Sequence, residues 1–206
     1  MPAADHVRND VGAMNERWVA ERRGRAGPDV MAEFAEVTAA RLDALRAMPA
    51  ERFEETGPSP VGVVPYREFM VVRVMDCWVH EQDMRVATDR VRRFEGEAAT
   101  VAMGRIASAM PFVVGKRAGA PKGSSVRIEV GPPTGPIHIE VRDGRARAVG
   151  ALRGEPTVTV VMDADALWRL GCGRIQGSAA RQAGMVTVAG DGALGAAVVD
   201  AMAFMI

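Results

Sequence analysis

The sequence predicts two structural units, an α-helical bundle over residues 1–118 and an α+β unit over residues 119–206 built from a small antiparallel sheet with helices. Two observations lead to this prediction. Apolar residues recur at helical spacing up to about residue 120 and alternate as in strands after it. At the change of pattern, residues 119–123 include two glycines and a proline, which favour a break between the units.

Four helices are expected in the first unit. The second begins at Pro28 and Asp29, residues that suit a helix start, and carries an apolar side expected to be packed. The third is apolar on most sides and is expected at the buried centre of the bundle. Residues 56–65 hold too many prolines and glycines for a helix and are expected to form a loop. The expected helices cover residues 5–23, 28–48, 66–86 and 95–116.

The second unit shows the alternation of half-buried strands. Asp143-Gly144 is a strong signal for a tight hairpin between two of them. Asp163 suits the start of a short helix, and Gly190-Asp-Gly192 indicates a turn that begins the last helix rather than a phosphate-binding loop. Four strands expected to pair antiparallel cover residues 125–130, 137–141, 145–149 and 157–162, with a further strand at 185–188 and helices at 163–170 and 192–204.

Composition narrows the classes of function. The 206 residues are 48% hydrophobic and 25% charged, which is ordinary for a folded chain. The 26 basic and 26 acidic residues are intermixed, so no basic stripe for nucleic acid is expected. The two cysteines are distant in sequence, which favours a reducing compartment. The sequence shows no signal peptide and no uninterrupted apolar run of about 20 residues, so we expect a cytoplasmic protein without a membrane partner.

The most informative stretch is Arg73-Val-Met-Asp-Cys-Trp-Val-His-Glu-Gln-Asp-Met-Arg85. It places Asp76, His80 and Asp83 on one face of the third helix, at i, i+4 and i+7. Imidazole nitrogen and carboxylate oxygen one turn apart are ligands for a divalent metal such as zinc. Two other interpretations stay open: Asp76 and His80 form a buried hydrogen-bonded pair, and Asp83 pairs with Arg85 or with a neighbouring helix.

The neighbours of these residues are expected to be structural. Glu81 and Gln82 are expected to face away from Asp76 and His80, toward solvent or another helix. The sequence also contains two cysteines and two tryptophans that are expected to fill the core, although the second tryptophan would also suit a pocket wall. These are Cys77, Cys172, Trp78 and Trp168.

The run Asp76-Cys-Trp-Val-His-Glu-Gln-Asp-Met-Arg85 resembles the helix signature of the mycothiol-dependent maleylpyruvate isomerase family, whose N-terminal domain is a DinB-like bundle. The stretches Pro65-Tyr-Arg-Glu68 and Val113-Val-Gly-Lys-Arg-Ala-Gly-Ala-Pro121 also resemble this family. Arg169-Leu-Gly-Cys-Gly-Arg174 and Val188-Ala-Gly-Asp191 are similar to its C-terminal domain, which resembles sterol carrier proteins. The resemblance covers nearly the whole chain.

The resemblance implies a divalent metal, usually zinc, held by a His of the first bundle helix and by a Glu and a His at i and i+4 of the third. Asp76 falls on the Glu position and His80 on the His position, and the shorter Asp side chain would shift the metal. Mycothiol would bind to the metal as a thiolate, add to an activated double bond, and leave after rotation about that bond. The helix with the first His is missing here, because His6 aligns with a stretch downstream of it.

The implied substrate is a small electrophile whose carboxylates Arg169 or Arg174 would hold. The sequence therefore predicts a metal- and mycothiol-dependent isomerase or thiol transferase. Two alternatives stay open. One is a non-catalytic module with a dry pocket for a small hydrophobic ligand. The other is an N-terminally truncated, inactive relative whose exposed apolar groove leads to a homodimer.

Overall fold

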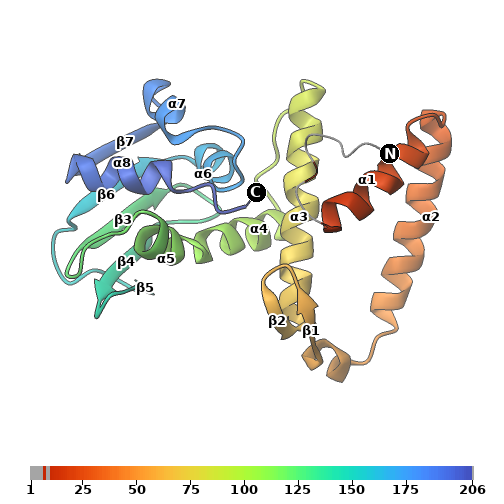
Figure 1. The fold of residues 1–206 in the computed structure, drawn as a ribbon, viewed down its shortest axis with the longest axis horizontal. Coiled ribbons are helices and arrows are strands. Elements are labelled where there is room, and N and C mark those ends of the chain that lie inside the picture. The colour runs from red at the N-terminus through yellow and green to blue at the C-terminus, as the bar shows by residue number, and fades with distance from the viewer. Residues whose placement is uncertain (1–6, 8–9, 206) are drawn as a thin grey trace. The chain divides into compact units, whose positions relative to one another are not determined.

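The computed structural model describes Val7 and residues 10–205 and divides the chain into two compact units, Met1–Glu55 and Thr56–Ile206 (Figure 1). The first unit contains helix α1 (Asp10–Arg22), helix α2 (Gly27–Arg46) and a short 3₁₀ helix, η1 (Ala50–Glu54). Both predicted helices are therefore present. The predicted start of the first helix at residue 5 and the side chain of His6 lie outside the described residues.

An ion-pair cluster holds the connection between α1 and α2. The Glu33 carboxylate accepts hydrogen bonds from Arg22 and Arg25, one to each of its oxygens. The pKa of Glu33 is lowered chiefly by the hydrogen bond from Arg22 and then by that from Arg25. The predicted packing of the apolar side of α2 is not seen, because α2 has no buried residue among those described, and Phe34 is 62% exposed.

The second unit begins with a hairpin over residues that were predicted to form a loop. Strands β1 (Thr56–Ser59) and β2 (Gly62–Pro65) pair antiparallel, with Pro58 opposite Val63. A two-stranded ribbon has two free edges, so a proline can occupy a strand without breaking the ladder. Gly62, at φ 107°, provides the backbone conformation that the turn requires.

Helices α3 (Tyr66–Ala87) and α4 (Glu97–Ser108) follow and pack on each other. Only one side of α3 is buried, through Met75, Trp78, Val79 and Gln82. The prediction that α3 is the buried centre of the helical bundle is therefore wrong, because α4 packs on one stripe of this helix and much of the remainder is exposed.

The predicted fourth helix is made of three consecutive segments, namely α4, the single turn α5 (Met110–Phe112) and the π-helical turn η2 (Val113–Arg117). Pro111 lacks the N–H that a continuous helix would need at this point. Within the described residues, one stretch, Glu97–Arg117, is long and apolar enough to cross a membrane by length and composition, with a mean hydropathy of 1.4. Much of it is buried in the protein core, and Arg105 interrupts its apolar run.

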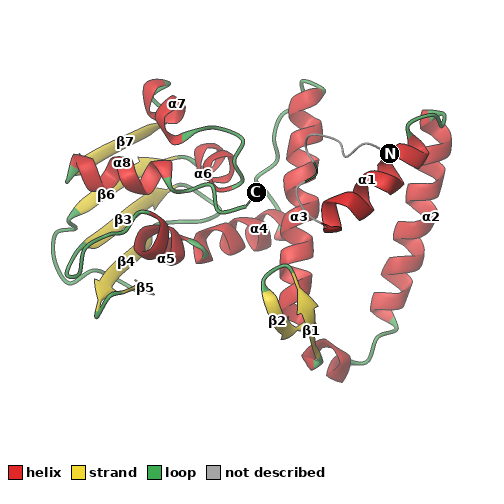
Figure 2. Cartoon of the chain, in the orientation of Figure 1, coloured by secondary structure: helices red, strands yellow, loops and turns green. Residues whose placement is uncertain are grey.

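A five-stranded sheet forms the remainder of the unit (Figure 2). Its strands are β3 (Ser125–Val130), β4 (Ile137–Arg142), β5 (Arg145–Val149), β6 (Val158–Met162) and β7 (Val186–Gly190). Helices α6 (Ala164–Gly171) and α7 (Gly177–Gln182) lie between β6 and β7 in sequence, and α8 (Gly192–Asp200) follows β7. The short helix α7 was not predicted.

The strand order is β5-β4-β3-β6-β7, and the expectation of a purely antiparallel sheet is wrong. Strand β6 pairs parallel to β3, with Val126 opposite Val158. Strand β4 pairs with one side of β3. The chain that leaves β5 therefore crosses to the free side of β3, where β6 runs in the same direction as β3. The hairpin prediction is confirmed, since Asp143 and Gly144 both have positive φ between β4 and β5.

The two faces of the sheet differ in character. Apolar residues at every second position are buried against α5, η2 and α8. Residue Gly115 of η2 approaches β5 so closely that an added Cβ would lie 2.7 Å from the Cβ of Ala146. The opposite face is polar, and its charged residues are Arg127, Glu129, Glu140, Arg142, Arg145 and Arg147.

Candidate functional site

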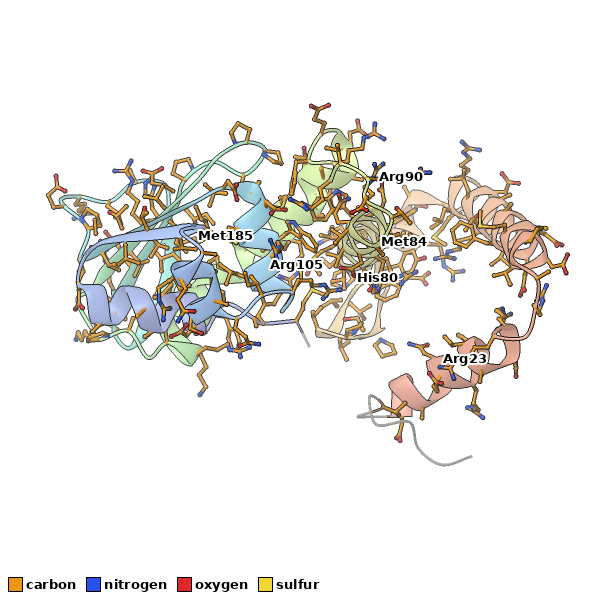
Figure 3. The ribbon with its side chains drawn as sticks, turned by 90° about the horizontal axis from the view of Figure 1, so that it is seen from above. Arg23, His80, Met84, Arg90, Arg105 and Met185 are labelled. Atoms are coloured by element: carbon orange, nitrogen blue, oxygen red, sulfur yellow. The ribbon has the colours of Figure 1, made fainter. Side chains whose placement is uncertain are left out.

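Helix α3 places the predicted row of residues on one face. The buried stripe Met75, Trp78, Val79 and Gln82 fixes the rotation of the helix. Asp76 and Asp83 lie at the border of that stripe, about a third exposed, and His80 is 62% exposed between them. His80 and Met84, one turn apart, both lie at the surface of α3 (Figure 3). The i, i+4, i+7 arrangement is confirmed.

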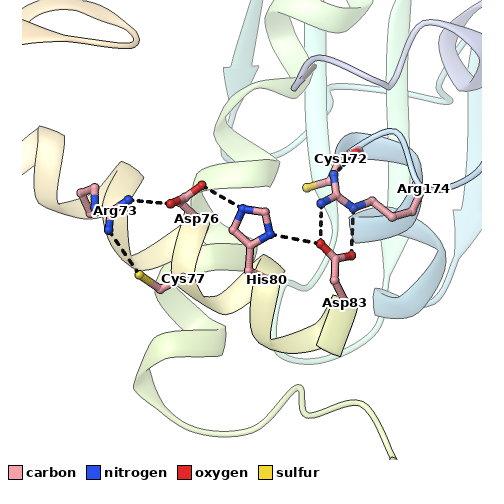
Figure 4. Close-up of polar contacts among 7 residues, drawn as sticks. All are labelled: Arg73, Asp76, Cys77, His80, Asp83, Cys172 and Arg174. Carbon is pink, nitrogen blue, oxygen red and sulfur yellow. Dashed lines mark hydrogen bonds and ion pairs between the residues drawn. The ribbon is translucent and has the colours of Figure 1, made fainter. Parts of the chain in front are cut away.

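The imidazole of His80 lies between the two carboxylates (Figure 4). His80 Nε2 is 3.5 Å from Asp76 Oδ1, and His80 Nδ1 is 3.3 Å from Asp83 Oδ2. The pairing of Asp76 with His80 is thus present, but on an exposed face rather than in a core. A neutral imidazole carries one N–H, so it can donate to only one of these carboxylates.

Each carboxylate is also contacted by an arginine. Arg73 Nη1 donates to Asp76 Oδ2 at 2.6 Å. Arg174 forms a two-pronged contact with Asp83, from Nε to Oδ1 at 3.0 Å and from Nη2 to Oδ2 at 2.6 Å. The hydrogen bonds from Arg174 lower the pKa of Asp83, with a smaller contribution from His80, and Asp83 raises the pKa of Arg174. Carboxylates thus alternate with nitrogen-bearing side chains along the row.

Asp83 therefore pairs with a residue 91 positions away, in the segment after α6. The predicted alternative of Arg85 is not observed, because Arg85 pairs with Glu81 at 2.8 Å along α3. Gln82 faces away from Asp76 and His80, as predicted, but its partner lies in the loop before α4 rather than in solvent or another helix. Gln82 is fully buried, and its Oε1 accepts from the backbone N–H of Arg93 at 2.7 Å.

The two arginines expected to hold substrate carboxylates have different surroundings. Arg174 belongs to the row, and its Nη1 also donates to the carbonyl of Cys172. Arg169 lies 3.7 Å from Asp165, one turn earlier on α6, and 3.9 Å from Met185 Sδ. The structure thus brings Arg174, but not Arg169, into contact with the row on α3. A substrate role for either arginine stays a prediction.

The two cysteines also differ. Cys172 is buried as predicted, and burial raises the pKa of its thiol to about 11. Cys77 is exposed, so its predicted place in the core is wrong. Helical spacing places it on the side of α3 away from the buried stripe, and Arg73 Nη2 lies 3.8 Å from its Sγ. Trp78 and Trp168 are core residues, 3% and 1% exposed.

Asp76 and His80 fit two positions of a metal site. Ligand atoms about 2.1 Å from a tetrahedral zinc ion lie about 3.4 Å apart. The 3.5 Å between Asp76 Oδ1 and His80 Nε2 agrees with that separation. Among Val7 and residues 10–205, no group of three or more His, Cys, Asp or Glu side chains is arranged to hold a metal. Within the described residues, the candidate metal site therefore consists of Asp76 and His80 alone.

Comparison with protein families assigns both parts of the chain. Residues 1–85 match the mycothiol maleylpyruvate isomerase N-terminal domain, and residues 115–203 match the SCP-2 sterol transfer family. The two matches follow one another along the chain without overlapping. The first matched segment includes most of α3 with Asp76, His80 and Asp83, and the second includes Arg169 and Arg174. This arrangement confirms the resemblance and the order of the domains.

Individual proteins share little sequence identity with this chain. No curated protein matches the chain. The UbiJ-SCP2 ubiquinone synthesis protein has 17% identity over 66% of this chain and 96% of its own, with a TM-score of 0.32. Palmitated SCP2L2 from Aedes aegypti has 14% identity over 50% and 95%, with a TM-score of 0.38. The sec-alkylsulfatase Pisa1 from Pseudomonas sp. has 22% identity over 37% and 12%, with a TM-score of 0.32.

Proposed function

We propose that this chain is a mycothiol-dependent isomerase or thiol transferase in which Asp76 and His80 hold a divalent metal such as zinc. The observation that carries the proposal is the 3.5 Å between Asp76 Oδ1 and His80 Nε2 on an exposed helix face. The match of residues 1–85 to the isomerase N-terminal domain supports the thiol chemistry.

The residues around the pair have defined tasks in this proposal. A bound divalent metal would lower the pKa of a thiol, so that the thiolate is available near neutral pH. Arg73 occupies Asp76 Oδ2 and thereby leaves Oδ1 as the oxygen that faces His80. His80 is 62% exposed, so a thiol and a small electrophile can reach it from solvent. In this proposal Arg174, which binds Asp83 at the end of the row, would meet a carboxylate of that electrophile.

The test is the metal content of the purified protein, measured by plasma mass spectrometry on four samples prepared identically. Wild type and His138→Ala are expected to hold zinc, because His138 lies on β4 and contacts the Gly150 carbonyl. His80→Ala and Asp76→Ala are expected to lose it. Circular dichroism checks that all four are folded. Wild-type protein without metal, or His80→Ala that retains it, would refute the proposed site.

A second candidate is a carrier of small hydrophobic ligands, which the match of residues 115–203 to the SCP-2 sterol transfer family favours. The recesses described beside β4 and β5 do not resemble a dry pocket. One of them, with a volume of about 420 Å³, is lined by charged residues that include Glu140, Arg142 and Arg147. Titration of metal-free protein with a fluorescent fatty acid separates the two candidates. Saturable binding that His80→Ala leaves unchanged supports the carrier.

A further inference from the structure

We propose that Asp83, fixed by Arg174, is a positioning residue that holds the proton of the neutral His80 imidazole on Nδ1 and so leaves the lone pair of Nε2 facing Asp76. The proposal deepens the proposed function, because Nε2 is the nitrogen assigned there to the metal. It also gives Arg174 a task other than contact with a substrate.

The distances favour Asp83 over Asp76 as the acceptor for the imidazole N–H. Nδ1 lies 3.3 Å from Asp83 Oδ2 and Nε2 lies 3.5 Å from Asp76 Oδ1, so Asp83 is the nearer of the two acceptors, although both contacts are longer than the usual N–H···O hydrogen bond. A hydrogen bond from His80 is among the causes that lower the pKa of Asp83. When one ring nitrogen donates to a carboxylate, the other is left as the ligand atom.

Arg174 fixes Asp83 in the orientation that this hydrogen bond needs. Its planar guanidinium binds both Asp83 oxygens, so the carboxylate cannot rotate without losing one of two charge-assisted hydrogen bonds. The guanidinium is held in turn by its donation to the Cys172 carbonyl. Each of the three groups therefore sets the orientation of the next, from the backbone at Cys172 through Arg174 and Asp83 to the ring of His80.

This chain of contacts begins in the SCP-2 domain and ends on the helix of the isomerase-family domain. A substitution at Arg174 should therefore change the state of the His80 ring without touching it. A purely structural ion pair between Arg174 and Asp83 would stabilise the fold but leave the tautomer of His80 unaffected. The tautomer is thus the property that separates the two roles.

The tautomer is measured by nitrogen NMR on metal-free protein labelled with ¹⁵N at histidine, at about pH 8.5, roughly two units above the ordinary imidazole pKa. The chain has three histidines, so the signals of His80 are identified by their loss in His80→Gln. We expect a protonated Nδ1 and an unprotonated Nε2 in wild type. Asp83→Ala should shift the proton toward Nε2, and Arg174→Gln should produce a mixture.

The matched control is Glu81→Ala, which removes another ion pair of α3, that with Arg85, and should leave the His80 signals unchanged. The inference is overturned if wild-type His80 carries its proton on Nε2 or on both nitrogens, or if Asp83→Ala does not change the tautomer. Since no metal is present, this result does not depend on the proposed metal site. If wild type does bind zinc, Asp83→Ala should weaken its affinity about 10- to 100-fold.

Discussion

The indole rings of Trp78 and Trp168 meet edge to face, with centroids 6.1 Å apart. The first belongs to α3 and the second to α6, so this contact joins the helix that carries His80 to the helix that precedes Arg174. Both indole N–H groups are satisfied, by the Arg93 carbonyl at 3.1 Å and by Asp165 Oδ1 at 3.0 Å. The position of Arg174 against Asp83 therefore depends on a packed aromatic pair.

Trp168→Ala should lower the free energy of unfolding by about 3–5 kcal/mol, because a large buried side chain leaves a cavity. Phe112→Ala is the control, since Phe112 is 55% exposed and its loss should change stability by about 0.5 kcal/mol or less. Urea denaturation followed by circular dichroism measures both variants. Equal losses of stability would contradict the placement of Trp168 in the core.

Gln82→Leu should destabilise the protein by about 1–3 kcal/mol, even though the two side chains have similar volumes. The variant loses the amide oxygen that accepts the Arg93 backbone N–H, and a buried donor without a partner is costly. Hydrogen exchange at the Arg93 amide should accelerate, whereas Glu81→Ala should leave it unchanged. An unchanged rate in Gln82→Leu would show that this amide has another acceptor.

Arg174→Gln should reduce stability by about 1 kcal/mol, a value kept small by solvent screening of a pair whose side chains are each 32% exposed. Asp83→Asn should cost a similar amount, and the double variant little more than either, because all three remove one interaction. Denaturation of the four proteins at low and high salt gives the coupling energy. Fully additive losses would mean that the two residues act independently.

Iodoacetamide at neutral pH should modify Cys77 and spare Cys172. Cys77 is exposed, whereas burial of Cys172 raises the pKa of its thiol to about 11 and keeps it protonated and inaccessible. Peptide mass spectrometry after timed labelling gives the two rates. Labelling in denaturant is the control, and there the two cysteines should react alike.

Glu33 should titrate below the ordinary range of a glutamate, because Arg22 and Arg25 both donate to its charged form. A lowered pKa means that the stabilising contribution is present above the unfolded-state pKa and is lost as the pH falls through the folded-state value. NMR titration of the carboxyl carbon measures this pKa. Arg22→Gln should raise this pKa, and an ordinary pKa in wild type would contradict the ion-pair cluster between α1 and α2.

Helical spacing alone was sufficient to predict the row on α3. In a helix, residues four and seven positions apart share a face, so Asp76, His80 and Asp83 were placed correctly without tertiary information. The arginine that binds Asp83 at the end of this row was harder to predict. Arg174 lies 91 residues from Asp83, and no local pattern identifies such a partner. The sequence analysis predicted a substrate carboxylate as the partner of this arginine and did not predict its contact with Asp83.

Strand direction and side-chain exposure were predicted less well, for related reasons. Alternation in β6 identifies a strand, but its parallel pairing depends on which side of β3 is still free. The exposure of Cys77 depends on which stripe of α3 is covered by α4. Both properties are decided by packing between distant segments, which residue spacing does not encode.

The arginines of β5 affect whether two copies of the protein can pair through the edges of their sheets. Strand β5 is an edge of the five-stranded sheet, and Arg145 and Arg147 project from it in exposed positions. A second copy that added its own β5 to this edge would bring like charges together across the new pair. Charged edge strands resist such strand addition. The sheet can therefore leave one edge open without offering a template for aggregation.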